Sequence, residues 1–140
     1  MPAFREDGSS IELKDLLSRI PENRWVWAIL DFYGIGEAPN DLSMEDFETA
    51  VQTEPDGFIM TWQELKEFSS RLNQTYDCLI VASSSLGDLP SDRSAKENFC
   101  GCDVVIEAFD RTEWSISIRD PVLLKKFSDA GTEGPVHLKG

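Results

Sequence analysis

The stretch Asp103-Val-Val-Ile-Glu-Ala-Phe-Asp-Arg-Thr-Glu-Trp-Ser-Ile-Ser-Ile118 gives the clearest indication of the fold. Two runs of apolar and β-branched residues, 103–109 and 113–118, flank a short polar turn, and this pattern predicts a β-hairpin. In the second run Trp114 and two isoleucines alternate with serines, so one face of the hairpin is expected to be half-exposed. The sequence therefore predicts at least one antiparallel pair of strands.

Further strands and helices are predicted on both sides of the hairpin. The runs 24–33 and 77–83 are apolar at consecutive positions, which is typical of strands buried on both faces. A short strand or extended link is expected at 58–60. Capping residues followed by apolar positions at helical spacing predict about four helices. These helices are expected over residues 11–20, 44–53, 62–73 and 121–127.

Together these elements predict the α+β class. The expected architecture is a single domain over residues 1–130, with a mixed, mostly antiparallel sheet of four to five strands and about four helices. Residues 131–140 are rich in Gly and Pro and are predicted to form a flexible tail. The polar stretch 84–101 is predicted to be a long loop, and loops of this length are usually functional or mobile.

The cysteines and the N-terminal residues indicate the compartment. Neither a secretory signal nor an apolar run long enough to cross a membrane is visible in the sequence. Cys78, Cys100 and Cys102 are an odd number and cannot all pair within the chain. Free thiols in a reducing environment are the simplest interpretation, so a cytoplasmic location is expected.

The net charge narrows the range of partners. The 140 residues include 26 Asp and Glu against 13 Lys and Arg, which gives a formal net charge of -13. Nucleic acids and anionic membranes are bound through cationic patches, so neither is expected as a direct ligand. The partner classes that remain are small neutral ligands, cations and basic proteins.

The negative charge is concentrated in one part of the chain. Residues 37–65 contain no Lys or Arg, and on the helix predicted over 44–53 the acidic side chains Glu45, Asp46 and Glu48 face water. These acids could simply stabilise a solvated helix by complementing its dipole. They could equally form a surface for a basic partner, since unpaired like charges raise association rates with cationic proteins. The eight acidic residues are Glu37, Asp41, Glu45, Asp46, Glu48, Glu54, Asp56 and Glu64.

A search for catalytic or metal-binding patterns finds none that is specific. The only histidine, His137, lies in the predicted tail, so neither a Ser–His or Cys–His pair nor a two-histidine metal site is expected. The Cys100-Gly-Cys102 spacing is a poor match to zinc and redox motifs. Gly34-Ile-Gly36 lacks the third glycine of a nucleotide-binding turn. The sequence therefore predicts no catalytic residues, no metal and no cofactor.

In size, low pI and layout the chain resembles the small acidic immunity proteins of bacterial toxin–immunity systems. The hairpin of residues 104–118 precedes a capped helix, and Glu107-Ala-Phe-Asp-Arg-Thr-Glu-Trp114 resembles a hairpin that recurs in such proteins. This resemblance implies a non-catalytic cytoplasmic inhibitor that binds a toxin domain, often a nuclease, in a tight 1:1 complex. Surface carboxylates would then occupy the cationic cleft of the toxin.

Applied to this chain, the resemblance and the charge pattern predict a set of partner-binding residues. Glu45, Asp46 and Glu48 are the central ones. Trp114 is added because the exposed face of a hairpin is a common protein-contact surface. The complete set is Asp41, Glu45, Asp46, Glu48, Asp56 and Trp114.

Two other functions stay open at this stage. The chain could be a carboxylate-based enzyme or a small-ligand-binding domain, with a pocket near Asp31, Asp77 and Glu107 at strand ends. It could also be an adaptor subunit whose apolar hairpin face pairs with another chain. The oligomeric state is left undetermined.

Overall fold

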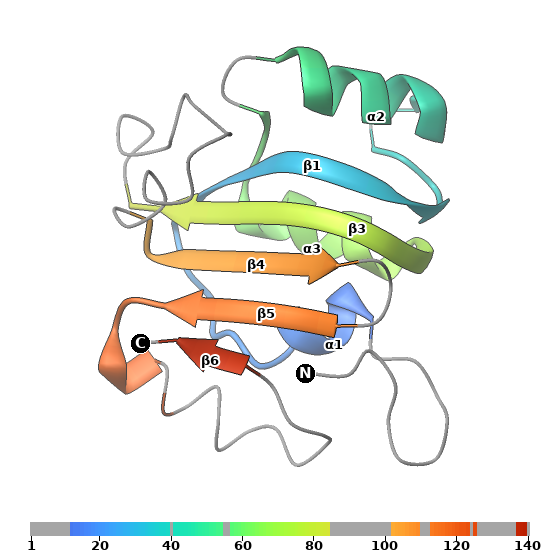
Figure 1. Ribbon diagram of the computed structural model, residues 1–140. Coiled ribbons are helices and arrows are strands. Elements are labelled where there is room, and N and C mark those ends of the chain that lie inside the picture. Colours follow the sequence, from blue (N-terminus) through green and yellow to red (C-terminus); the bar gives the residue numbers. More distant parts are fainter. Residues whose placement is uncertain are drawn as a thin grey trace.

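One mixed sheet of six strands organises the fold. The computed structural model describes residues 12–39, 41–54, 57–84, 102–109, 113–123, 125 and 137–139. The strand order is β2-β1-β3-β4-β5-β6, and all neighbours are antiparallel except β5 and β6 (Figure 1). The strands are β1 (Val26–Gly36), β2 (Phe58–Met60), β3 (Leu72–Ser83), β4 (Val104–Phe109), β5 (Glu113–Ile118) and β6 (His137–Lys139).

Within the described residues, three helices pack against this sheet, and a further helical turn spans residues 121–123. Helices α1 and α3 cover one face of the sheet, whereas α2 runs beside the outer part of β1 (Figure 1). The prediction of an α+β fold with a mixed, mostly antiparallel sheet is confirmed. The helices are α1 (Leu13–Leu17), α2 (Met44–Thr53) and α3 (Trp62–Ser70).

The predicted caps set the starts of α2 and α3. Ser43 Oγ accepts the backbone N–H of Asp46, and Thr61 and Glu64 form a reciprocal capping box. Helix α3 ends at Ser70, earlier than predicted, because Leu72 is already paired with Gly36 in the sheet. The strand predicted at 77–83 therefore begins five residues sooner.

The main core lies between the sheet and the helices. Trp27, Ile29 and Phe32 of β1 face it, together with alternate residues of β3, β4 and β5. A smaller group on the opposite face of the sheet contains Ala28, Leu30, Val81 and Cys102. Both faces of β1 and β3 are therefore buried near the middle of the sheet, as predicted.

The end of the chain differs from the sequence-based expectation. Residues 137–139, which fall in the predicted flexible tail, form β6 and pair in parallel with 115–117. This strand is the sixth in a sheet for which four to five were expected. The predicted 84–101 loop lies outside the described residues except for Ser84, whose N–H donates to Asp103 Oδ2.

In the part of the chain that the structure describes, every helix is too short or too polar to cross a membrane.

Candidate protein-binding surface

Helix α2 closes an edge that the sheet would otherwise leave open. Strand β2 pairs only with Trp27, Ala28 and Ile29, so the outer half of β1 has no strand on that side among the described residues. There the N–H of Gly34 donates to Glu48 Oε2 at 3.3 Å, and Gln52 Nε2 donates to Asp31 Oδ1 at 2.6 Å. Helix α2 therefore takes the place of a strand and protects the edge from pairing with another chain.

Aromatic packing holds α2 in this position. Phe47 is fully buried, and its ring lies 5.7 Å from Phe32, 5.0 Å from Phe58 and 5.0 Å from Phe68, measured between centroids. These rings come from α2, β1, β2 and α3. Phe47 and Val51 form the buried face of the helix, Met44 packs against the same core, and Glu48 and Gln52 bond to β1. Glu45 and Asp46 are exposed.

Three of the predicted partner-binding residues lie on this outer face or just before it. Asp41, Glu45 and Asp46 are exposed, and no ion pair involves them in the described part of the molecule. We refer to these three residues as the acidic edge. Asp41 has a φ of 61°, a left-handed conformation that Asp and Asn tolerate better than most residues.

The other predicted residues have different positions. Glu48 is half-buried and accepts the Gly34 N–H, so part of its role is to attach α2 to the sheet. Asp56 lies outside the described residues. Trp114 is 2% exposed, so the prediction that it lies on an exposed contact face is wrong. It pairs with Ala108 on the face of the sheet that the helices cover, and the serines of β5 occupy the other face.

An exposed aromatic patch adjoins the acidic edge and was missed by sequence reasoning. Tyr33 is 57% exposed and Ile35 is 48% exposed, on the face of the sheet opposite α1 and α3. The rings of Tyr33 and Tyr76 lie 5.2 Å apart. We refer to Tyr33, Ile35 and Tyr76 as the tyrosine patch. Its one signal in the sequence is that Tyr33 and Ile35 alternate with Phe32 and Gly34.

Irregularities in the pairing of β1 with β3 create this patch. The register shifts after Ile29 and again after Tyr33, and such bulges change the face to which following side chains point. Gly34, between Tyr33 and Ile35, has no room for a side chain, because a Cβ there would lie 2.5 Å from the Gln74 carbonyl oxygen. The strand predicted to be buried on both faces is therefore exposed on one face beyond Leu30.

The carboxylates considered for catalysis do not form a described pocket. Asp31 and Glu107 flank Leu79 in one row across the sheet, and Asp77 pairs with Tyr33. Asp31 is exposed and accepts a hydrogen bond from Gln52. Neither of the two described cavities includes any of the three. Over the described residues, no group of three or more His, Cys, Asp or Glu is placed to hold a metal ion.

The described cysteines are buried thiols. Burial raises the pKa of Cys78 well above that of a free thiol, and the negative charges of Asp31, Glu107 and Asp77 raise it further, against a smaller opposing effect from the Ala108 backbone. Cys102 is also a buried thiol. Since the thiolate is the reactive form, neither residue is placed for redox or nucleophilic chemistry.

This burial predicts slow thiol modification in the folded protein. In a Cys100→Ser variant, which leaves Cys78 and Cys102, Ellman's reagent should react with no thiol before unfolding and with both in guanidinium chloride. Absorbance at the thionitrobenzoate band measures the reaction. Rapid release of one equivalent from the folded variant would contradict the buried positions of these thiols.

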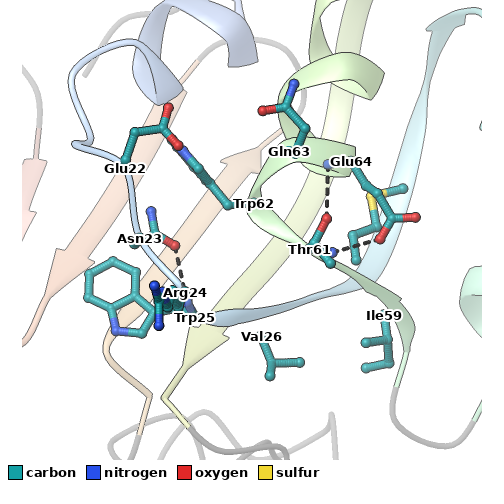
Figure 2. Close-up of a pocket in the computed structure, with 11 residues that line it drawn as sticks. Glu22, Asn23, Arg24, Trp25, Val26, Ile59, Thr61, Trp62, Gln63 and Glu64 are labelled. Carbon is teal, nitrogen blue, oxygen red and sulfur yellow. Dashed lines mark hydrogen bonds between the residues drawn. The ribbon is translucent and has the colours of Figure 1, made fainter.

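A cavity lies at the other end of β1. It measures about 500 Å³ and is bounded by the segment before β1 and by the β2–α3 junction (Figure 2). Its surface is mainly apolar, with Trp25, Val26 and Ile59 among the lining side chains. Its remaining lining residues are Glu22, Asn23, Arg24, Met60, Thr61, Trp62, Gln63 and Glu64.

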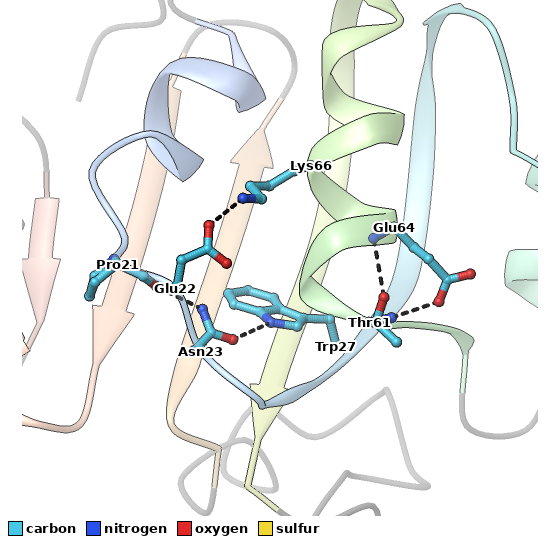
Figure 3. A network of polar contacts seen from close by, with 7 residues as sticks. All are labelled: Pro21, Glu22, Asn23, Trp27, Thr61, Glu64 and Lys66. Carbon is cyan, nitrogen blue, oxygen red and sulfur yellow. Dashed lines mark hydrogen bonds and ion pairs between the residues drawn. The ribbon is translucent and has the colours of Figure 1, made fainter.

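Most polar groups beside this cavity already have partners within the protein. Asn23 Oδ1 accepts the Trp27 indole N–H at 3.1 Å, and Glu22 forms an ion pair with Lys66 (Figure 3). The hydrogen bond from Lys66 is the main reason that the pKa of Glu22 is lowered, with a smaller contribution from the Trp62 indole. The Trp62 N–H is buried, and its geometry toward Glu22 falls short of a hydrogen bond.

Comparisons of this chain with protein families, with curated proteins and with solved structures found no match.

Proposed function

We propose that this chain is a non-catalytic binding protein, specifically an immunity protein that neutralises a basic toxin or effector domain by blocking its active cleft. The observation that carries the proposal is the one-sided charge of the sheet edge formed by β1 and α2. Asp41, Glu45 and Asp46 are exposed there and form no ion pair with any described residue, in a segment with eight acids and no bases.

Charges arranged in this way contribute little to folding, because neighbouring like charges repel one another. They act instead at long range: an acidic surface raises the rate of encounter with a cationic cleft by one to three orders of magnitude. Carboxylates that enter the cleft would then compete with its anionic substrate, and the bulk of the domain would exclude the substrate sterically. The proposal includes a bacterial cytoplasmic setting, in which Cys78 and Cys102 stay as thiols.

Capture followed by reconstitution tests this function. The full chain, immobilised, is incubated with an extract of its cell of origin, and the protein retained is identified, purified and recombined with the free chain. We expect a basic protein that forms a 1:1 complex and loses its enzymatic activity when the complex forms. A retained protein that keeps its full activity in the saturated complex would contradict the proposal.

A second candidate function, the binding of a small apolar ligand, is favoured by the cavity beside Trp25. Its volume of about 500 Å³ and its apolar walls fall in the range of small-molecule sites. The same experiment separates the two candidates, because a ligand-binding domain would retain no stoichiometric basic protein. The adaptor alternative required an exposed apolar face on the β4–β5 hairpin. That face is buried in the core of the domain, so it is not available to pair with another chain.

A further inference from the structure

The tyrosine patch and the acidic edge are carried by neighbouring parts of the chain, because α2 is bonded to β1. Gly34 lies between Tyr33 and Ile35, and its N–H donates to Glu48 on α2. Two residues before Tyr33, Asp31 accepts a hydrogen bond from Gln52 on the same helix. A partner attracted by the carboxylates of α2 would therefore meet the exposed ring of Tyr33 on the adjacent strand.

Contacts within the protein preorganise the tyrosine patch. Tyr33 lies in the paired part of β1, and its ring contacts that of the half-buried Tyr76 in a tilted arrangement with ring planes 37° apart. The Tyr76 hydroxyl donates to Gln74 Oε1 at 3.0 Å, which fixes the second ring. Rigid tyrosines with exposed ring faces lose little conformational entropy on binding and are enriched among the residues that dominate interface energies.

The charges around the rings indicate which side chain of the partner fits them. Asp77 is the cross-strand neighbour of Tyr33, and Asp31 precedes it on the same face of β1. An aromatic face beside carboxylates matches a guanidinium group, which stacks on rings through its flat surface and pairs with carboxylates through its N–H groups. A lysine ammonium fits less well, because it is compact and strongly hydrated.

We propose that the tyrosine patch seats arginine side chains of the basic partner, with a guanidinium stacked on Tyr33 and paired with Asp31. This inference rests on the proposed function, and it assigns the two parts of the surface different tasks. The acidic edge sets the rate of association, whereas the tyrosine patch sets how long the complex lasts.

A peptide titration tests the patch without the partner. The full chain, labelled with ¹³C in its tyrosine rings, is titrated with the peptide acetyl-Gly-Arg-Gly-Arg-Gly-amide and with its lysine counterpart. The arginine peptide should shift the Tyr33 and Tyr76 ring signals with millimolar affinity, and the lysine peptide should bind at least about threefold more weakly. Equal shifts from both peptides, or no ring shift with either, would overturn the assignment.

Three variants complete the test. Tyr33→Phe should keep the response to the arginine peptide, and Tyr33→Ser should abolish the Tyr76 shift. Val122→Ser is the matched control, because Val122 is 63% exposed and lies outside the patch. With the purified partner, Tyr33→Ser should raise the dissociation rate constant by about tenfold or more and leave the association rate constant unchanged.

The possible failures are distinguishable. If the arginine peptide does not bind at the rings, the patch assignment is wrong and the proposed function is unaffected. If the peptide binds as described and removal of the carboxylates of α2 leaves association with the partner unchanged, the proposed role of the acidic edge is wrong and the patch assignment stands.

Discussion

Neutralising Glu45 and Asp46 together should slow association with the basic partner by about ten- to a hundredfold at low ionic strength. Both side chains are exposed on α2 and have no ion pair within the described residues, so the charge that they lose acts on approaching molecules and, within the fold, on the dipole of α2. Adding Asp41→Asn should slow association further. Stopped-flow tryptophan fluorescence measures the rate constant.

The control removes the same number of charges elsewhere. Glu22 and Glu67 are exposed and lie outside the 37–65 segment, so a Glu22→Gln/Glu67→Gln variant has the same net charge as Glu45→Gln/Asp46→Asn. We expect this control variant to change the association rate constant by less than about threefold, because salt limits the range over which an exposed charge acts to roughly a Debye length. Equal slowing by both variants would mean that net charge, not the acidic edge, governs encounter.

Replacing Phe47 with Ala should lower the free energy of unfolding by about 3–5 kcal/mol. The side chain is fully buried among rings from β1, β2 and α3, so the substitution leaves a cavity where α2 meets the sheet. A loss of this size is a large fraction of the roughly 5–15 kcal/mol typical of a small domain. Urea unfolding followed by circular dichroism measures it.

Two further substitutions show whether the effect arises from packing. Phe47→Leu keeps most of the buried volume and should cost clearly less than Phe47→Ala. Val122→Ala alters an exposed side chain and should stay within about 0.5 kcal/mol of the unmodified protein. If Phe47→Ala cost less than about 1 kcal/mol, α2 would not be packed against the sheet as described.

The elements with strong local signals could be predicted from the sequence. The hairpin 104–118 follows from its alternation, and α2 and α3 begin directly after Ser43 and Thr61 because each of these caps satisfies backbone donors within three residues. Residues 72–76 and 137–139 lack such signals. They become strands only because a partner strand from elsewhere in the chain supplies their hydrogen bonds, which is information that a local pattern does not contain.

The residues of the candidate surface also divide into those that the sequence could predict and those that it could not. The exposure of Glu45 and Asp46 could be expected from their positions on the predicted helix, and that of Asp41 from its place in the polar segment before it. Trp114 was misassigned because alternation defines two faces without saying which one the helices cover. Tyr33 was missed because a register shift at Leu30 changed which face its side chain occupies. Both errors concern the face of a strand, which tertiary packing decides.

The dependence of the association rate constant on salt tests the central claim most directly. The unmodified chain and its purified partner are mixed in stopped flow at NaCl concentrations from about 20 to 500 mM, over which the Debye length falls severalfold. We predict that the rate constant falls steeply across this range and that the Glu45→Gln/Asp46→Asn variant shows a much shallower slope. A rate constant that is independent of salt, or equal slopes for the two proteins, would contradict a role for the acidic edge in partner binding.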